Sequence, residues 1–154
     1  MNLISSNILK RFCALMLCAC MLLCMTACNS KNTEDIEEVD QICVTGSYTE
    51  SWMHVYTDKD FVNEMVDIYN SIQYEETDET VDVMTAGEVF FFTFNKGNDE
   101  QAKLIVDKNS VITFEAGTQC YKIVSEFDFD YVKGLVDEQR EAFEKTLEAT
   151  PDEA

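Results

Sequence analysis

The chain has 154 residues, of which 11 are basic and 30 are acidic, so its formal net charge at pH 7 is −19. This length corresponds to a single domain of ordinary size. A surface this acidic repels nucleic acid and anionic lipid headgroups, which excludes nucleic-acid binding as the main function. The charge favours cationic partners, or it serves only to keep the domain soluble.

The first 28 residues contain the three parts of a secretory signal. Lys10 and Arg11 form a basic region, and an uncharged stretch of 16 residues follows from Phe12 to Ala27. A membrane-spanning helix needs about 20 apolar residues, so this run favours a cleaved signal over a permanent span. Ala27 supplies the small residue before the cleavage point, and Cys28 follows it directly.

The sequence Met-Thr-Ala-Cys at residues 25–28 resembles the lipobox of bacterial lipoproteins, although that family usually has Leu where this chain has Met25. The resemblance implies cleavage before Cys28 and a diacylglyceryl group on its sulfur. The two acyl chains of this group anchor a protein stably in the membrane. Because the signal directs export, the resemblance also implies a position on the extracytoplasmic face of the cell membrane. An ordinary cleaved signal with an incidental cysteine is the alternative.

Removal of the signal, residues 1–27, leaves 127 residues with 9 basic and 30 acidic side chains, a formal charge of −21. We predict that residues 28–40 form a flexible tether, residues 41–149 a single domain, and residues 150–154 a disordered tail. Outside the signal and the lipobox only Cys43 and Cys120 remain. In an oxidising compartment these two can pair, and elsewhere they stay reduced.

Alternating polar and apolar residues predict strands at residues 41–45 and 52–56, which together form a hairpin. Thr57 is suited to cap a following helix, because Asp60 stands at the spacing of a capping box. The helix should end near residues 71–74, and its apolar side chains fall on one stripe. The run of acidic residues at 75–79 predicts a loop.

The second half of the chain is rich in short strand patterns. Val81 and Val83 are candidates for one strand, and residues 88–94 are the most strongly β-forming run. Strands at 102–106, 111–115 and 119–125, joined by short turns, predict an antiparallel meander. Asp128 is expected to cap a second helix. The predicted apolar stripe of that helix consists of Tyr131, Leu135, Val136, Phe143 and Leu147.

This order predicts an α+β domain, in which an antiparallel sheet of five to six strands carries two helices on one face. The chain is similar to a small domain of uncharacterised secreted proteins and lipoproteins of Gram-positive bacteria, on the segments VYTDKD (55–60), IVDKN (105–109) and CYKI (120–123). That resemblance implies the fold class and no specific activity.

The two cysteines of the domain are candidates for a disulfide under one condition. If the first strand lies beside the last, Cys43 and Cys120 occupy adjacent strands on the same face and approach each other. A Cα separation beyond about 7 Å would rule out the bond.

The sequence contains no set of residues that common catalytic or metal chemistry requires. His54 is the only histidine, so a two-histidine metal site cannot form. Acidic pairs at residues 58/60 and 128/130 stand at predicted helix starts, where carboxylates offset the helix dipole. The segment that begins at Asp107 has Ile112 where a calcium loop needs glycine. We therefore expect no enzymatic activity, no metal and no cofactor.

One cluster is a candidate for ligand or partner contact. Tyr48, Trp52, His54 and Tyr56 lie in the first predicted hairpin, and the last three alternate onto one face. Aromatic side chains with a polar tip are frequent in saccharide and peptide contacts. The cluster is a contact surface if its face is the outer one, and it is core if its face is the inner one.

Two hypotheses of function follow. In the first, the chain is a non-enzymatic lipoprotein of the cell envelope whose domain binds a partner protein. In the second, it binds a small ligand or a saccharide through Tyr48, Trp52 and Tyr56.

Overall fold

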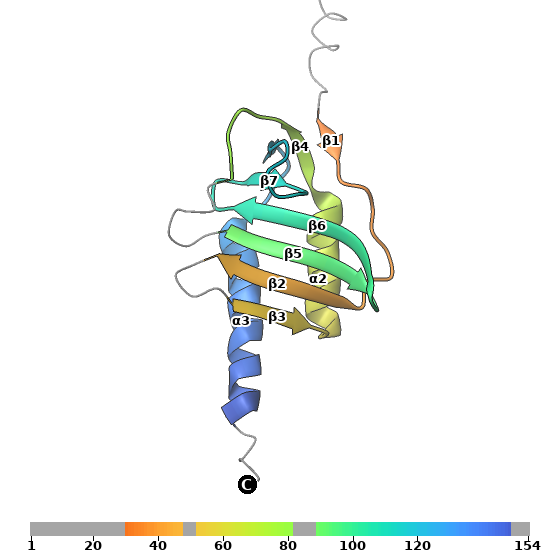
Figure 1. Ribbon diagram of the computed structural model, residues 1–154, viewed down its shortest axis with the longest axis vertical. Coiled ribbons are helices and arrows are strands. Elements are labelled where there is room, and N and C mark those ends of the chain that lie inside the picture. The colour runs from red at the N-terminus through yellow and green to blue at the C-terminus, as the bar shows by residue number, and fades with distance from the viewer. Residues whose placement is uncertain (1–29, 48–51, 82–88, 149–154) are drawn as a thin grey trace, which may run out of the picture. The chain divides into compact units, whose positions relative to one another are not determined.

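A computed structural model of the chain describes residues 30–47, 52–81 and 89–148 (Figure 1). The predictions for the signal, Cys28, Tyr48, Val83 and the tail lie outside these residues. The described part has an α+β fold, an open antiparallel sheet of eight strands with two helices. Neither helix is long and apolar enough to cross a membrane.

The elements follow one another in an order close to the predicted one. They are β1 (Lys31–Asn32), β2 (Gln41–Ser47), β3 (Trp52–Tyr56), α2 (Lys59–Ser71), β4 (Gln73–Glu76), β5 (Val89–Lys96), β6 (Asp99–Asp107), β7 (Val111–Thr113), β8 (Tyr121–Ile123) and α3 (Phe129–Glu148). In space the strands run β1-β4-β8-β7-β6-β5-β2-β3. The predicted hairpin and the predicted meander of β5 to β8 are confirmed. The strand number was predicted too low, because β1 and β4 extend the meander beyond β8.

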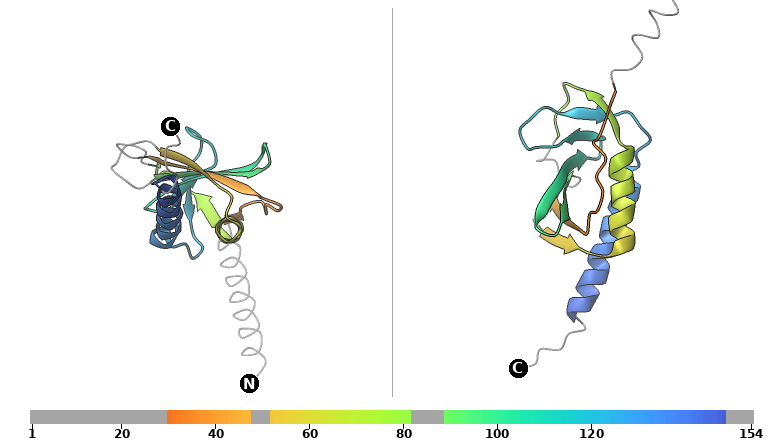
Figure 2. Two further views of the ribbon diagram at one scale, coloured as in Figure 1. Left: turned by 90° about the horizontal axis from the view of Figure 1, so that it is seen from below. Right: turned by 90° about the vertical axis from the view of Figure 1, so that its right-hand side faces the viewer.

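Both helices lie against one face of the sheet (Figure 2). Strand β5 supplies the centre of that face, because it pairs with β2 on one side and β6 on the other. Alternate residues of β5 point to the same side of a strand, which places Phe90, Phe92 and Phe94 in one buried row. Phe90 stacks on Phe129 of α3 at 5.6 Å between ring centroids, and Phe94 meets Tyr69 of α2 at 5.0 Å.

The helix starts are set by aspartate caps. The backbone N–H of Phe61 donates to the Asp58 carboxylate at 3.0 Å, so the cap of α2 is Asp58 and the predicted cap Thr57 is wrong by one residue. The predicted cap of α3 is confirmed, since the N–H of Tyr131 donates to Asp128 at 3.0 Å. In each case the carboxylate satisfies a backbone donor that the first helical turn leaves unpaired.

The apolar stripe of α3 differs in part from the predicted one. Phe129, Val132 and Val136 are buried against the sheet, whereas Tyr131 and Phe143 are exposed. The buried residues follow one another at steps of three and four, which fixes the side of α3 that faces the core. The side chain of Leu147 lies outside the described residues.

Residues 31–40 belong to the folded domain and not to a tether. Lys31 and Asn32 pair with Tyr74 and Gln73 of β4, and Lys31 also forms an ion pair with Glu76 at 3.0 Å. The acidic run was expected to be a loop, but its first residues form β4 between β1 and β8. A strand that pairs on both sides obtains its stability from partners that are remote in sequence, and a short acidic pattern does not reveal them.

We call residues 33–40, which connect β1 to β2, the strap. The hydroxyl of Thr33 donates to the Tyr69 carbonyl at 2.7 Å. The amide side chain of Asn70 holds Ile36 at both its N–H and its carbonyl, at 3.0 and 3.1 Å. At the far end the Asp40 carboxylate accepts from the N–H of Gly97 at 2.9 Å. These bonds and the buried side chain of Ile36 fix the strap to the domain.

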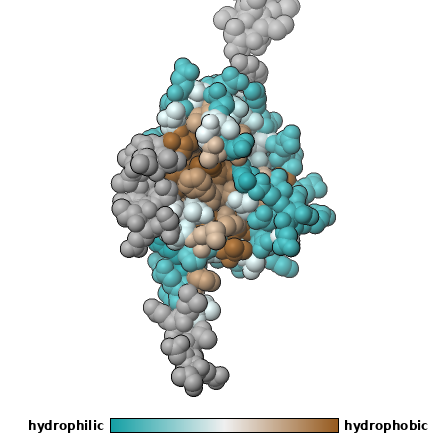
Figure 3. Space-filling view, viewed as in Figure 1, coloured by the Kyte–Doolittle hydropathy of each residue, from teal (hydrophilic) through white to brown (hydrophobic). Residues whose placement is uncertain are grey.

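The face of the sheet opposite the helices is apolar at its centre (Figure 3). Thr45 of β2, Phe91 of β5 and Ile105 of β6 are partners across adjacent strands on this face. Phe91 is part-exposed, and the apolar side chains of Met53 and Val55 on β3 are the most exposed of this face. A neutral, apolar surface on so acidic a protein is a candidate for contact with another molecule.

Replacement of Ile36 tests whether the strap is part of the fold. We expect Ile36→Ala to lower the free energy of unfolding by about 2 kcal/mol, because it leaves a cavity beneath the strap. Urea denaturation of the full chain measures the change, and Glu37→Ala at the neighbouring exposed position is the control. An Ile36→Ala variant with the same unfolding midpoint as the control would contradict a docked strap.

Candidate functional site

The aromatic cluster of the first hairpin lies on the side of the sheet that faces the helices. Trp52, His54 and Tyr56 alternate along β3 onto that side. The guanidinium of Arg140 lies 5.5 Å from the Trp52 ring, and the Phe143 ring meets His54 at 4.8 Å. Of the two interpretations given above, the inner face is the observed one, and Trp52 and His54 pack α3 against β3.

Tyr56 is the most enclosed of the three. Its hydroxyl has no hydrogen-bond partner among the described residues, and its ring packs edge-on against Phe61 at 5.2 Å. The pKa of Tyr56 is raised to about 12, chiefly by burial; Arg140 opposes the shift, and the carboxylates of Glu144 and Asp137 add to it. Tyr56 therefore stays protonated at neutral pH and acts as a core residue.

Strand β3 is the last strand of the sheet, and α3 extends beyond it. Within the described part of the chain β3 pairs only with β2. Helix α3 crosses the strands steeply, meets β3 at Arg140 and Phe143, and continues to Glu148 (Figures 1 and 2). Five further residues add about 7.5 Å of helix, more than the spacing of about 4.8 Å between neighbouring strands. The helix thus extends past the β3 edge by at least the width of one strand.

The side chains around this edge are apolar, and ion pairs on α3 border them. Met53 and Val55 point to the open face and are 66% and 51% exposed, and Phe143 on α3 is 39% exposed. Near Phe143 on the same helix, Glu141 pairs with Lys145 at 3.6 Å and Glu144 pairs with Arg140 at 3.9 Å. We refer to Met53, Val55 and Phe143 together as the β3 edge site.

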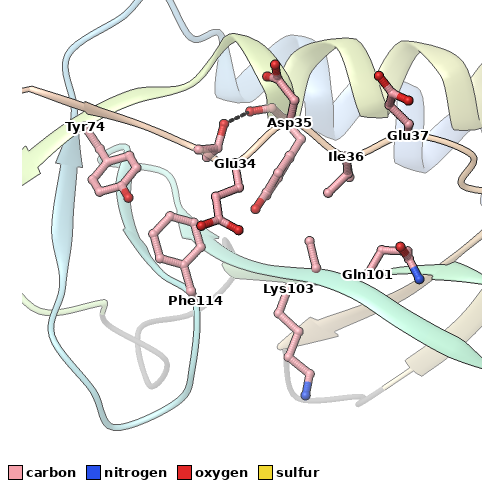
Figure 4. Close-up of a pocket in the computed structure, with 11 residues that line it drawn as sticks. Glu34, Asp35, Ile36, Glu37, Tyr74, Gln101, Lys103 and Phe114 are labelled. Carbon is pink, nitrogen blue, oxygen red and sulfur yellow. Dashed lines mark hydrogen bonds between the residues drawn. The ribbon is translucent and has the colours of Figure 1, made fainter.

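A cavity of about 620 Å³ lies under the strap (Figure 4). Its walls come from the strap, from Tyr69 of α2 and Tyr74 of β4, from residues 101–103 of β6, and from Phe114 beyond β7. The rings of Tyr74 and Phe114 meet at 5.2 Å. A volume of this size lies in the range of small-molecule sites.

The charges around the cavity are uneven. Glu34, Asp35 and Glu37 all lie on its rim, and Figure 4 shows the Glu34 carboxylate beside the Phe114 ring. Lys103 points away from the cavity and pairs with Glu100 at 2.8 Å. The cavity is therefore acidic at one wall and aromatic at another.

Sequence reasoning missed this cavity. Its acidic residues belong to the segment predicted as a tether. Tyr69 lies in the first predicted helix, where its ring counts only as one of the apolar side chains of the stripe. A possible signal is the combination of Thr33 and Ile36 within that polar segment, since both side chains are buried in the structure.

The predicted proximity of Cys43 and Cys120 is wrong. Strands β5, β6 and β7 stand between β2, which carries Cys43, and β8, which Cys120 precedes. Four strand spacings amount to roughly 19 Å, and both thiols are free. The prediction failed because the hairpin of β2 and β3 joins β5 and does not return to β8. Burial raises the pKa of the Cys43 thiol against the opposing effect of a hydrogen bond with Thr45, which lowers its reactivity at neutral pH.

Within residues 30–47, 52–81 and 89–148, no group of three or more His, Cys, Asp or Glu residues is arranged to hold a metal ion. No protein-family model, no curated protein and no solved structure matches this chain. The β3 edge site and the cavity under the strap are therefore interpreted from their own residues.

Substitution of Tyr56 by Phe tests the unpaired hydroxyl. We expect Tyr56→Phe to leave stability at pH 7 unchanged or to raise it by about 1 kcal/mol, because it removes a buried group that lacks a partner. A loss of stability larger than this would show that the hydroxyl has a partner in the native state.

The same variant gives an alkaline signature. An exposed tyrosine loses its proton near pH 10, whereas folded Tyr56 holds its proton to about pH 12. Between these pH values the unfolded state binds fewer protons than the folded state, so stability falls as pH rises. Urea denaturation from pH 9 to pH 12 should show a shallower decline for Tyr56→Phe, and identical slopes would contradict the raised pKa.

Proposed function

We propose that this chain is a lipid-anchored binding module on the extracytoplasmic face of the cell membrane, and that it binds a partner protein by adding a strand of that partner to β3. The signal and the lipobox at Cys28 support the anchor. The observation that supports the binding mode is the extension of α3 beyond the last strand. A ninth strand could pair with β3 and pack on this end of the helix.

The β3 edge lacks the usual protection against strand addition. Natural sheets guard their edges with charged side chains, proline or a covering segment, because an open edge presents unpaired N–H and C=O groups. The sequence of β3 is Trp-Met-His-Val-Tyr, which contains neither proline nor a lysine, arginine, aspartate or glutamate. An extended peptide that pairs with this edge gains main-chain hydrogen bonds and places alternate side chains on the two faces.

The surroundings of the edge define the chemistry of the partner strand. Side chains on its open face would continue the apolar surface of Met53 and Val55. Side chains on its other face would lie against α3 beside Phe143, where Glu141 and Glu144 already pair with Lys145 and Arg140. The partner strand is therefore apolar on its open face, and a basic partner protein would suit the strongly negative charge of this chain.

The pairing of β1 with β4 also limits the distance between the domain and the anchor. With lipid on Cys28, only Asn29 and Ser30 separate the anchored residue from Lys31 of β1. An extended chain covers at most about 11 Å over this interval. The domain would then stay close to the bilayer, and its partner would be a protein of the membrane or of the adjoining envelope.

The second hypothesis, saccharide or small-ligand binding by Tyr48, Trp52 and Tyr56, has less support. Tyr56 is buried, and Trp52 already lies against Arg140. Tyr48 lies outside the described residues.

Site-specific photo-crosslinking in the cells that produce the protein tests the proposal. A photoreactive residue at position 53 should capture one defined partner, and Cys28→Ala should abolish capture by releasing the protein from the membrane. Mass spectrometry identifies the partner, which is then purified.

Substitution of two similarly exposed valines then tests whether the partner binds at the β3 edge or elsewhere on the surface. Val55 is 51% exposed and Val124 is 45% exposed. Val55→Lys should weaken binding of the purified partner at least about tenfold, as expected for a central interface residue, while Val124→Lys should change it less than twofold. Equal effects of the two substitutions, or none at Val55, would refute the β3 edge as the interface.

A further inference from the structure

The rim of the cavity under the strap carries an exposed carboxylate, Glu34, with no counter-charge among the described residues. Among the described residues Glu34 forms no ion pair and no hydrogen bond through its side chain. The neighbouring lysines are engaged elsewhere, Lys103 with Glu100 and Lys31 with Glu76. In Figure 4 the Glu34 carboxylate lies next to the Phe114 ring, and the Tyr74 ring lies on the other side of Phe114.

A second observation comes from Tyr69, which is only 5% exposed and lines the same cavity. Its hydroxyl has no hydrogen-bond partner among the described residues, although its backbone carbonyl accepts from Thr33. Burial raises the pKa of Tyr69, and the proximity of Tyr74 and Glu34 raises it further. The Tyr69 side chain is therefore largely buried, while its hydroxyl stays accessible at the cavity that it lines and is free to bond to a ligand.

The third feature of the cavity is its aromatic wall. Tyr74 meets Phe114 at 5.2 Å and Tyr121 at 4.9 Å, and both contacts are edge-to-face. Aromatic faces attract ammonium and guanidinium groups within about 6 Å of their centroids. The protein already shows such a contact nearby, since the Lys31 ammonium lies 5.8 Å from the Tyr121 ring.

From these features we infer that the cavity under the strap binds an organic cation, an ammonium or guanidinium group joined to an apolar body. Glu34 would neutralise the charge, and the Tyr69 hydroxyl would accept a hydrogen bond from the ligand N–H. Tyr74 and Phe114 would cover the apolar part. The volume of about 620 Å³ admits a ligand of drug size.

This inference is independent of the β3 edge site. The cavity is built on β4, β6 and the segment after β7, and strands β5 and β2 separate β6 from β3. Failure of strand addition at β3 therefore leaves the cation site untouched, and the converse also holds.

Isothermal titration calorimetry of the full chain in a neutral detergent tests the cation site. The probes are phenethylammonium and its uncharged analogue 2-phenylethanol, which has nearly the same shape. Phenethylammonium should bind at least tenfold more tightly than the alcohol.

Three variants assign the binding to the cavity. Glu34→Gln should weaken phenethylammonium binding at least tenfold, and Tyr69→Phe should weaken it several-fold without a change of shape. Asp99→Asn removes the same charge from the exposed start of β6 and should have less than a twofold effect. Thermal unfolding of each variant confirms that the domain is intact.

A further probe, N-acetyl-lysine methylamide, distinguishes the two sources of such a cation. Tighter binding of this amide than of phenethylammonium would identify a lysine side chain of a peptide as the ligand. The reverse order would identify a free amine. Three results would overturn the inference, namely no binding of either cation, equal binding of the alcohol, or an effect of Asp99→Asn as large as that of Glu34→Gln.

Discussion

The buried row of Phe90, Phe92 and Phe94 on β5 determines how the rest of the molecule is arranged. Strand β5 pairs with β2 and β6, so this row lies at the middle of the helix-covered face. Burial of one such side chain contributes about 1.5–3 kcal/mol, and all three side chains of the row are buried. Its two ends fix the helices separately, α2 through Tyr69 against Phe94 and α3 through Phe129 against Phe90.

The position of α3 explains why the two edges of the sheet differ. Because α3 starts against β5 and crosses the strands steeply, its second half reaches the hairpin of β2 and β3 and continues beyond it (Figure 1). At the opposite edge the short β1 ends the sheet, and its Lys31 pairs with Glu76 of β4. A two-residue edge strand with a charged side chain is a typical protection against further pairing, and β3 has neither feature.

The strap connects the same framework to the cavity. Its attachment to Tyr69 and Asn70 depends on the position of α2, which β5 sets through Phe94. The strap crosses the sheet without pairing with β6, and the space left between them is the cavity that Glu34 and Phe114 line. A cation there would pair with the exposed Glu34 carboxylate and donate a hydrogen bond to the Tyr69 hydroxyl.

The features that local patterns specify were predictable from the sequence. The alternation in β2 and β3, the stripe of α2, and the cap Asp128 are all set by residues within a few positions of one another. The features set by remote partners were not predictable. Strands β1 and β4 are short and polar, and only their pairing with each other and with β8 makes them strands. The cysteine prediction failed for the same reason, because it required knowing which strand the first hairpin joins.

The candidate sites follow the same division. Trp52, His54 and Tyr56 were correctly placed on one face, but the sequence could not tell whether α3 would cover that face. Met53 and Val55 alternate with these residues along β3, so they point to the opposite face and are exposed. Glu34 and Phe114 stand 80 residues apart in the chain, and nothing in local periodicity brings them together.

Hydrogen exchange of the full chain, alone and with its captured partner, is the most direct test of strand addition at β3. The account predicts that backbone amides of β3 exchange at least about tenfold more slowly in the complex, since outward N–H groups acquire hydrogen-bond acceptors. Amides of β1 at the other edge should be unchanged. A complex that forms while the β3 amides exchange at their free rate would contradict the account.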